Sequence, residues 1–160
     1  MQFQFGNSDA VAICRNVVDT VEKIKQTSAT VLFQTSHEKI EIYTDEARLQ
    51  QLLINLLINA TKFTTESSIT LVLEKEAEKM TVFSVTDTGC GIAPEKQGQI
   101  FNRFEKLNEN AQGSGLGLSI CQLIVERFGG RIWIDPEYKD GSRFLFTHPI
   151  HSINRKEAAQ

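Results

Sequence analysis

Residues 112–120 read Q-G-S-G-L-G-L-S-I, and this stretch is the strongest single indication of fold and ligand in the chain. Gly113, Gly115 and Gly117 alternate immediately before an apolar run with helical periodicity. Glycine has no Cβ to keep a ligand away, and the start of a helix offers unpaired N–H groups and partial positive charge. The segment therefore predicts a cradle for phosphate, with a flexible lead-in to an ordinary helix as the alternative.

Composition sets the scale of the molecule. With 160 residues and 41% hydrophobic content, the chain can bury roughly 70% of its unfolded surface, which suits one compact domain. A net charge of −3 argues against a nucleic-acid surface, so any phosphate ligand should be small. Three cysteines without C-x-x-C spacing favour a reducing, cytosolic setting. The sequence contains no apolar run of membrane-spanning length and no signal pattern, which predicts no membrane contact.

Hydrophobic periodicity and capping residues predict three helices and three strand pairs. Strand pairs alternating with helices favour a two-layer α/β (α+β) sandwich, in which a mixed, mostly antiparallel sheet carries three helices on one face. The expected helices are 9–25, capped by Ser8 or Asp9; 46–63, capped by Asp45; and 114–128. The expected strands form three pairs: a hairpin of 30–35 and 39–43, a second pair of 68–74 and 80–86, and a third pair of 131–135 and 142–147. A loop region is expected at 87–113, with a short helical piece around 94–104.

The helix expected at 46–63 has an unusual polar face. One narrow arc holds five polar residues and no acidic one: Arg48, Gln51, Asn55, Asn59 and Lys62. A solvated helix face is the ordinary explanation, but such faces usually mix Glu with Lys, and Asn is a poor helix former. Two Asn carbonyls and a lysine would instead offer oxygen to a hard cation and positive charge to phosphate. Mg²⁺ needs few protein ligands when phosphates and water complete its shell.

A second polar segment, D-T-G-C-G-I at 87–92, follows an apolar strand. Its ordinary explanation is a tight turn with glycines at positive φ. An ionised carboxylate cannot favour phosphate, so Asp87 would face the other end of a nucleotide and accept a hydrogen bond from an exocyclic amine such as that of adenine.

These segments together resemble the boxes of sensor histidine kinases. Residues 55–64, NLLINATKFT, resemble the N box; 87–92, the first glycine box; 101–104, FNRF, the F box; and 113–118, GSGLGL, the second glycine box. The flanks VERFGGRIW at 125–133 and GSRFLF at 141–146 are similar to the family's last helix and strand pair. The resemblance implies a catalytic and ATP-binding domain with the Bergerat fold of the GHKL superfamily, covering residues 1–152 and followed by a polar tail at 153–160.

By the same resemblance, Asn59 is the Mg²⁺ ligand, Asn55 a helper on the same face, Lys62 a phosphate contact and Asp87 the adenine acceptor. Residues 105–112 become an ATP lid, and Arg103 and Lys106 reach the γ-phosphate, although many members carry arginine where Lys106 stands. The remaining residues expected around ATP are Gly89, Gly91, Ile92, Phe104, Gly113, Ser114, Gly115, Leu116, Gly117 and Leu118.

The family's phosphoacceptor histidine lies in a separate helical hairpin, which the chain does not show. His37 precedes Glu38 but lies in a predicted turn, and we expect His148 and His151 to be solvated at a strand end and tail. The implied partners are ATP or ADP, a dimerisation and phosphoacceptor domain, and a downstream response regulator, with no nucleic acid. The implied location is the cytoplasm, alone or as the cytoplasmic part of a membrane-bound sensor.

Three functions are compatible with this superfamily. The first is the kinase half of a two-component sensor, and the second is a stand-alone anti-sigma regulator that phosphorylates a serine. The third is an ATP-driven clamp of the gyrase, MutL or heat-shock chaperone type, in which a glutamate one turn before the magnesium asparagine activates water. That position is Asn55, which counts against a dedicated hydrolase. The F box and the sequence GLGLSI favour the sensor kinase.

Overall fold

The computed structural model describes residues 2–63, 68–88, 115–138 and 141–151. A five-stranded sheet runs in the order β2-β4-β5-β7-β6, formed by β2 (Thr30–Thr35), β4 (Ser68–Glu76), β5 (Met80–Asp87), β7 (Ser142–Pro149) and β6 (Ile132–Ile134). The β2–β4 pair is parallel and the other three pairs are antiparallel. This confirms the predicted mixed, mostly antiparallel sheet.

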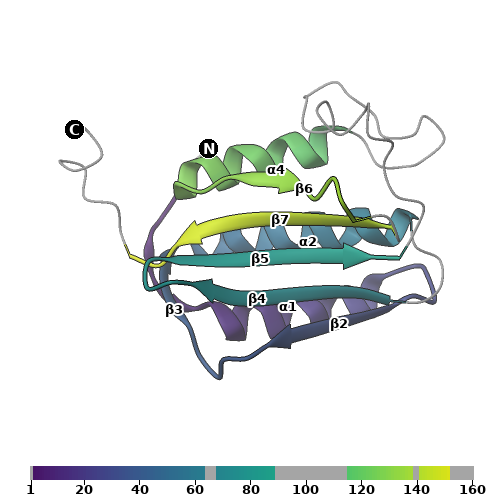
Figure 1. Cartoon of the computed structure of the whole chain (residues 1–160), viewed down its shortest axis with the longest axis horizontal. Helices are drawn as coiled ribbons and strands as arrows, with labels where there is room; N and C mark the ends of the chain where they lie inside the picture. The colour runs from purple at the N-terminus through teal and green to yellow at the C-terminus, as the bar shows by residue number, and fades with distance from the viewer. Residues whose placement is uncertain (1, 64–67, 89–114, 139–140, 152–160) are drawn as a thin grey trace.

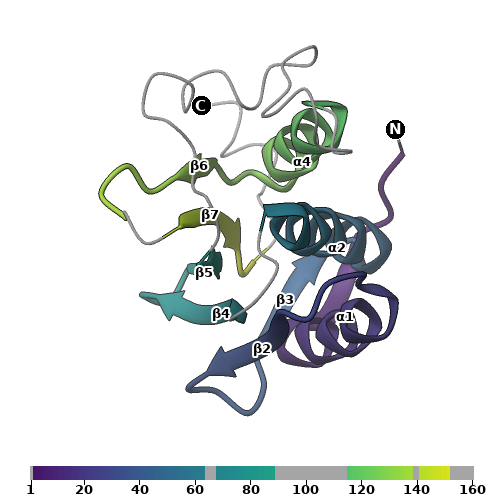
Figure 2. The same cartoon turned by 90° about the vertical axis from the view of Figure 1, so that its right-hand side faces the viewer.

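Three described helices lie on one face of this sheet, as Figure 2 shows. They are α1 (Ala10–Ile24), α2 (Glu46–Phe63) and α4 (Gly115–Phe128). The apolar stripe of each helix packs on the inward side chains of the strands, with Phe83 and Phe146 stacked at a centroid distance of 4.6 Å in the middle of the core. The predicted two-layer sandwich is thus confirmed.

The hairpin predicted for residues 30–35 and 39–43 is wrong. The first strand is β2, which pairs with β4, whereas the second is β3 (Glu41–Thr44), which pairs with β1 (Gly6–Asp9) in a separate two-stranded sheet. Sequence reasoning missed β1 because G-N-S-D carries no apolar alternation. Because β1 was not predicted, the preceding strand β2 was the only pairing partner that the sequence suggested for β3.

Two aspartates start the first two helices, as predicted. Asp9 Oδ1 accepts from Val11 N at 3.0 Å and from Ile40 N at 3.1 Å. Asp45 Oδ1 accepts from Arg48 N at 3.0 Å, which satisfies one of the unpaired donors of the first turn of α2. The helix ends expected from capping residues are therefore confirmed to within a residue or two.

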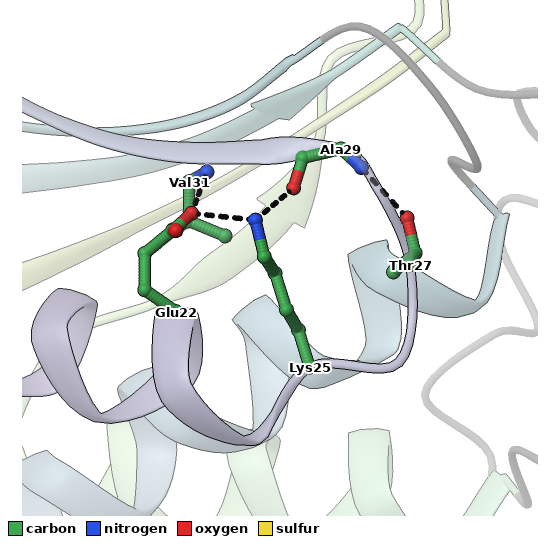
Figure 3. A network of polar contacts seen from close by, with 5 residues as sticks. All are labelled: Glu22, Lys25, Thr27, Ala29 and Val31. Carbon is green, nitrogen blue, oxygen red and sulfur yellow. Dashed lines mark hydrogen bonds and ion pairs between the residues drawn. The ribbon is translucent and has the colours of Figure 1, made fainter.

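The connection from α1 to β2 is fastened by one lysine (Figure 3). Lys25 Nζ donates to Glu22 Oε1 at 2.8 Å and to Ala29 O at 2.5 Å. The same Glu22 oxygen accepts from Val31 N at 2.5 Å. The end of the helix and the beginning of the strand are thus tied together by a single carboxylate and a single ammonium group.

The arrangement brings several chain segments to one end of the sheet. In Figure 1, the end of β5, the beginning of β7, the end of α2 and the beginning of α4 all lie at the right-hand end. The N-terminal residues of α2 and the end of α4 lie at the opposite end. The described parts of the predicted phosphate and adenine segments, which are far apart in sequence, therefore lie at the same end of the sheet.

Candidate nucleotide-binding site

Asp87 is the last residue of β5 and is 1% exposed. Its register partner on β7 is Ser142. Ser142 Oγ donates to Asp87 Oδ2 at 2.6 Å, and Ser142 N donates to Oδ1 at 3.3 Å. Two donors from one residue fix the orientation of the carboxylate at the end of the strand. A group held in this way is suited to accept a hydrogen bond from a ligand amine in a set direction.

Gly141 allows β7 to begin this close to Asp87. A Cβ at position 141 would lie 2.0 Å from Asp87 O and 2.8 Å from Thr88 Cα, and the residue has φ +152°. Both the space and the backbone conformation therefore require glycine. Gly141 and Ser142 therefore pack directly against Asp87 at the start of β7.

The two asparagines of the α2 polar face are half-buried near the end of the helix. The Asn55 amide hydrogen-bonds the thiol of Cys121 on α4, which links the two helices. Burial raises the pKa of that thiol to about 12, and the Asn55 hydrogen bond opposes the rise. Asn59 lies one turn nearer the site end of α2, where its amide oxygen can serve a ligand, and Lys62 follows it within the helix.

The polar arc predicted on α2 is not one site. Arg48 Nη1 donates to Gln51 Oε1 at 3.0 Å, and Arg48 Nε donates to Gln2 O at 3.3 Å. The Arg48 guanidinium also lies 5.7 Å from the centroid of the Phe3 ring. Since a helix rises 1.5 Å per residue, Arg48 and Asn59 are about 16 Å apart along the axis. The first half of the arc thus holds the N-terminal segment, and only the second half reaches the candidate site.

The beginning of α4 contains the described part of the predicted phosphate cradle. Gly115 and Gly117 lie in the first turn of the helix, where backbone N–H groups lack intrahelical acceptors. Leu118 is 2% exposed and belongs to the core, so it can contribute to a ligand site through its backbone. Leu116 lies in the same first turn.

Eight predicted site residues lie outside the described part of the chain: Gly89, Gly91, Ile92, Arg103, Phe104, Lys106, Gly113 and Ser114. The lid expected at 105–112 and the helical piece expected at 94–104 lie there as well.

The expectation that His148 is solvated is wrong. His148 is 1% exposed because β7 continues to Pro149 instead of ending at Thr147. Its Nδ1 donates to Pro149 O at 2.7 Å, so Nε2 accepts from Thr44 Oγ1, at 2.9 Å. Its ring lies 4.4 Å from that of Phe128, and burial lowers its pKa to about 4. His148 is thus a neutral core residue at the end of the sheet away from Asp87.

His37 lies between β2 and β3, outside any described helix. Its Nε2 is 3.6 Å from Glu74 Oε1, on the neighbouring β4. The hairpin turn predicted here is not formed, because β2 and β3 belong to different sheets, and His37 lies in the connection between them. This position differs from the acceptor helix that the resemblance implies for a phosphorylated histidine.

Ser142 and Gly141 are the site residues that sequence reasoning missed. The segment GSRFLF was read only as part of the last strand pair. Its role depends on the antiparallel register that places Ser142 opposite Asp87, 55 residues away. The available signal was a Gly-Ser pair at the start of the strand predicted to lie in the same sheet as the strand ending at Asp87.

Among the described residues, no three His, Cys, Asp or Glu side chains gather in a way that could hold a metal ion. None of the helices formed by these residues is long and apolar enough to cross a membrane.

Comparison with known families identifies the fold and its ligand class. The model of the histidine kinase-, DNA gyrase B- and HSP90-like ATPases matches residues 44–152, which includes the whole candidate site from α2 to β7. The chain belongs to this family. Asn59, Asp87 and the glycines of α4 therefore lie within an ATP-binding domain of the histidine-kinase type.

Similar proteins agree with this assignment. The adaptive-response sensory kinase SasA of Synechocystis is 36% identical over 157 residues, covering 94% of this chain and 41% of that protein. The nucleotide-free catalytic domain of the histidine kinase ThkA is 31% identical with a TM-score of 0.82, covering 94% of this chain and 100% of that chain. ThkA in complex with its response regulator TrrA is 30% identical with a TM-score of 0.76, covering 91% and 42%. The chain spans about two fifths of the length of the kinase SasA that it matches.

Proposed function

We propose that this domain binds Mg-ATP at the end of the sheet and donates the γ-phosphoryl group to a histidine on a separate phosphoacceptor domain. The observation that carries the proposal is the buried Asp87 carboxylate, oriented by Ser142 at the point where α2 ends and α4 begins. In this arrangement Asp87 accepts from the exocyclic amine of adenine. The N–H groups at the beginning of α4 bind the phosphates, and Gly113 and Ser114 directly precede this helix in the sequence.

The residues of α2 fit a magnesium ion that is shared with a nucleotide. Asn59 and Asn55 provide neutral amide oxygens, and Mg²⁺ is commonly bound by few protein ligands when phosphate and water oxygens complete its octahedron. The absence of an acidic cluster among the described residues agrees with an ion that arrives with the nucleotide. When bound, the ion neutralises charge on the β- and γ-phosphates, and Lys62, Arg103 and Lys106 would add positive charge there.

Phosphoryl transfer of this kind depends on positioning and charge neutralisation, since the domain contributes no covalent intermediate. The receiving histidine must then come from another domain, because His148 is buried in the core, His37 lies in a connection between strands, and His151 follows β7 outside any described helix. A response regulator is the expected next acceptor, as the ThkA–TrrA complex supports. An anti-sigma serine kinase is the second candidate, but the similar proteins are sensory kinases.

Titration calorimetry tests the nucleotide site. We expect ATP and ADP to bind in the presence of Mg²⁺ with Kd between about 1 μM and 1 mM. Asp87→Asn should weaken ATP at least tenfold and reduce the preference for ATP over GTP, because the amide presents a donor where adenine needs an acceptor. Asp9→Asn, in a second aspartate at the end of a strand, serves as the control. Unchanged ATP affinity in Asp87→Asn would refute the assignment.

Incubation with γ-labelled ATP tests the transfer step. We expect no stoichiometric label on the isolated chain, because none of its described histidines lies in an acceptor helix. Acid-labile label on His37 would overturn this expectation and place the acceptor within the domain.

A further inference from the structure

A buried thiol joins the two helices that border the candidate site. Cys121 of α4 is 0% exposed, and its Sγ donates to Leu52 O of α2 at 3.9 Å. The same sulfur is hydrogen-bonded to the side-chain amide of Asn55, three residues further along α2. The two helices lie side by side on the sheet (Figure 2). One thiol thus contacts a backbone carbonyl and a side-chain amide on one side of the neighbouring helix.

The single hydrogen of the thiol determines which end of the Asn55 amide faces it. Because Cys121 Sγ–H donates to Leu52 O, the sulfur can only accept from Asn55. An asparagine side chain donates only through Nδ2, so the nitrogen faces the sulfur and Oδ1, at the opposite end of the amide, is directed away from it. The Asn55 hydrogen bond also opposes the rise in the pKa of the thiol, as a donor to sulfur does.

The orientation of this amide matters because of its place in the fold. Asn55 is half-buried and lies one turn before Asn59, on the same side of α2. Cys121 lies three residues after Leu118, at the end of the first turn of α4. A hard cation binds an amide oxygen and is repelled by an amide NH2 group. The contact with Cys121 therefore determines which of the two Asn55 can present to a ligand.

We propose that Cys121 is a positioning residue of the nucleotide site, which holds the Asn55 amide with its oxygen available to the magnesium ion of Mg-ATP. This inference rests on the proposed function, because it assigns a ligand to the amide oxygen. Packing alone requires only a small apolar group at position 121, and alanine or valine would also meet that need. Neither could accept a hydrogen bond from Asn55 Nδ2, so the sulfur has a role beyond packing.

The freedom of the released side chain sets the size of the effect. In a helix, asparagine commonly adopts two χ1 rotamers, and each of them permits two amide orientations. An Asn55 released from Cys121 would occupy the productive arrangement about one quarter of the time, and affinity falls in proportion to that fraction. We therefore expect Cys121→Ala to weaken Mg-ATP binding about fourfold. Cys121→Ser should bind as the wild type does, because a hydroxyl donates and accepts at the same place.

Calorimetry of the whole chain with ATP, once in Mg²⁺ and once in EDTA, tests the proposal. Mg²⁺ should strengthen ATP binding to the wild type, and Cys121→Ala should reduce this gain about fourfold without changing the affinity measured in EDTA. Cys121→Ser should keep the whole gain. An equal gain in the wild type and Cys121→Ala would overturn the inference and leave the proposed function intact. No gain in the wild type would overturn the proposed magnesium site, and this role of Cys121 with it.

The matched control is Cys14→Ala, which removes a thiol of α1 that is equally buried. It should keep the gain from Mg²⁺, and an equal loss in this variant would overturn a specific role for Cys121. Hydrogen exchange of the Asn55 side-chain NH2 group, measured by NMR without nucleotide, tests the contact itself. Exchange should be slower in the wild type and Cys121→Ser than in Cys121→Ala. Equal exchange in all three would overturn the inference whether or not ATP binds.

Discussion

Two buried aspartates lie at opposite ends of the molecule, and we propose different roles for them. Asp45 is 7% exposed at the beginning of α2, and Asp87 is 1% exposed at the end of β5. Backbone or hydroxyl donors reach each carboxylate at comparable distances, among them contacts at 2.6 and 3.0 Å for Asp45 and at 2.6 and 3.3 Å for Asp87. Residue type, burial and hydrogen-bond distances therefore do not distinguish the cap from the candidate ligand group.

The elements around each aspartate make the difference. Asp45 accepts from Arg48 N in the helix that it caps and from Gln4 N of the N-terminal segment, so both of its carboxylate oxygens bind backbone N–H groups. The Asp87 carboxylate accepts from Ser142 of the neighbouring strand, and Asp87 lies at the end of the sheet where α2 ends and α4 begins (Figure 1). The comparison teaches that a candidate ligand carboxylate is distinguished from a helix cap by the elements that end or begin beside it.

The largest effect is expected from Gly141→Ala, which acts directly on the setting of Asp87. The new Cβ would lie 2.0 Å from Asp87 O, at a φ that disfavours alanine, so the beginning of β7 must move. We expect ATP affinity to fall about 100-fold and the free energy of unfolding to fall by about 3 kcal/mol. Calorimetry and urea unfolding measure both.

Gly6→Ala is the matched control for this change. Nothing lies within 4 Å of the position that its Cβ would occupy, so stability and ATP affinity should stay close to those of the wild type. If Gly141→Ala also bound ATP normally, the close approach of β7 to Asp87 would be irrelevant to the site.

The second prediction uses pH to test the end away from the nucleotide. His148 has a folded-state pKa of about 4, below its ordinary value of 6.5, because burial disfavours the charged ring. The unfolded chain therefore binds the proton first, and stability that is present above pH 6.5 is lost as the pH falls toward 4. We expect a loss of about 2 kcal/mol from this residue between pH 7 and pH 5.

Urea unfolding of the wild type and His148→Gln at both pH values measures this loss. The variant should lose less stability on acidification, and His151→Gln, at an exposed histidine, should behave as the wild type. Titration of His148 by NMR with a midpoint near 6.5 would contradict the prediction without any variant.

Local signals in the sequence predicted most of the fold. Apolar periodicity and the capping Asp9 and Asp45 located α1 and α2, and the charged turn at 75–79 located the β4–β5 pair. Partner choice was harder, because β2 pairs in parallel with β4 across an intervening strand and helix, and no local residue encodes that pairing. The four-residue strand β1 was missed because it is polar and short and therefore produces no periodic signal.

The candidate site was predicted to the extent that its residues have local chemistry. Asp87 at a strand end and the glycines before α4 were found in this way. Ser142 was not, because its role depends on strand register. The reverse error concerns Arg48 and Gln51, which share the helix face of Asn59 but interact at the other end of the helix.

Asp45→Ala sharpens the contrast between the two aspartates. The change leaves Arg48 N and Gln4 N without their acceptor, and the loss of a helix cap typically costs about 1 kcal/mol. We expect the free energy of unfolding to fall by about 1.5 kcal/mol, with ATP affinity within about twofold of the wild type. Asp87→Asn should show the opposite pattern. Similar losses of ATP affinity in both variants would mean that the start of α2 also contributes to nucleotide binding, which would contradict the contrast between the two aspartates.

The smallest effect is expected from Lys25→Met, which tests whether position near the site is sufficient for a role in binding. The α1–β2 connection lies at the same end of the sheet as Asp87 (Figure 1), yet Lys25 bonds only to Glu22 and Ala29 among the described residues. Methionine keeps much of the aliphatic stem and removes both bonds, and the ion pair is partly exposed, so we expect a loss of about 0.5–1 kcal/mol. Lys23→Met, in the same turn of α1, should change stability by less than half as much. ATP affinity should be unaffected in both variants, and a selective loss of ATP binding in Lys25→Met would extend the site to the beginning of β2.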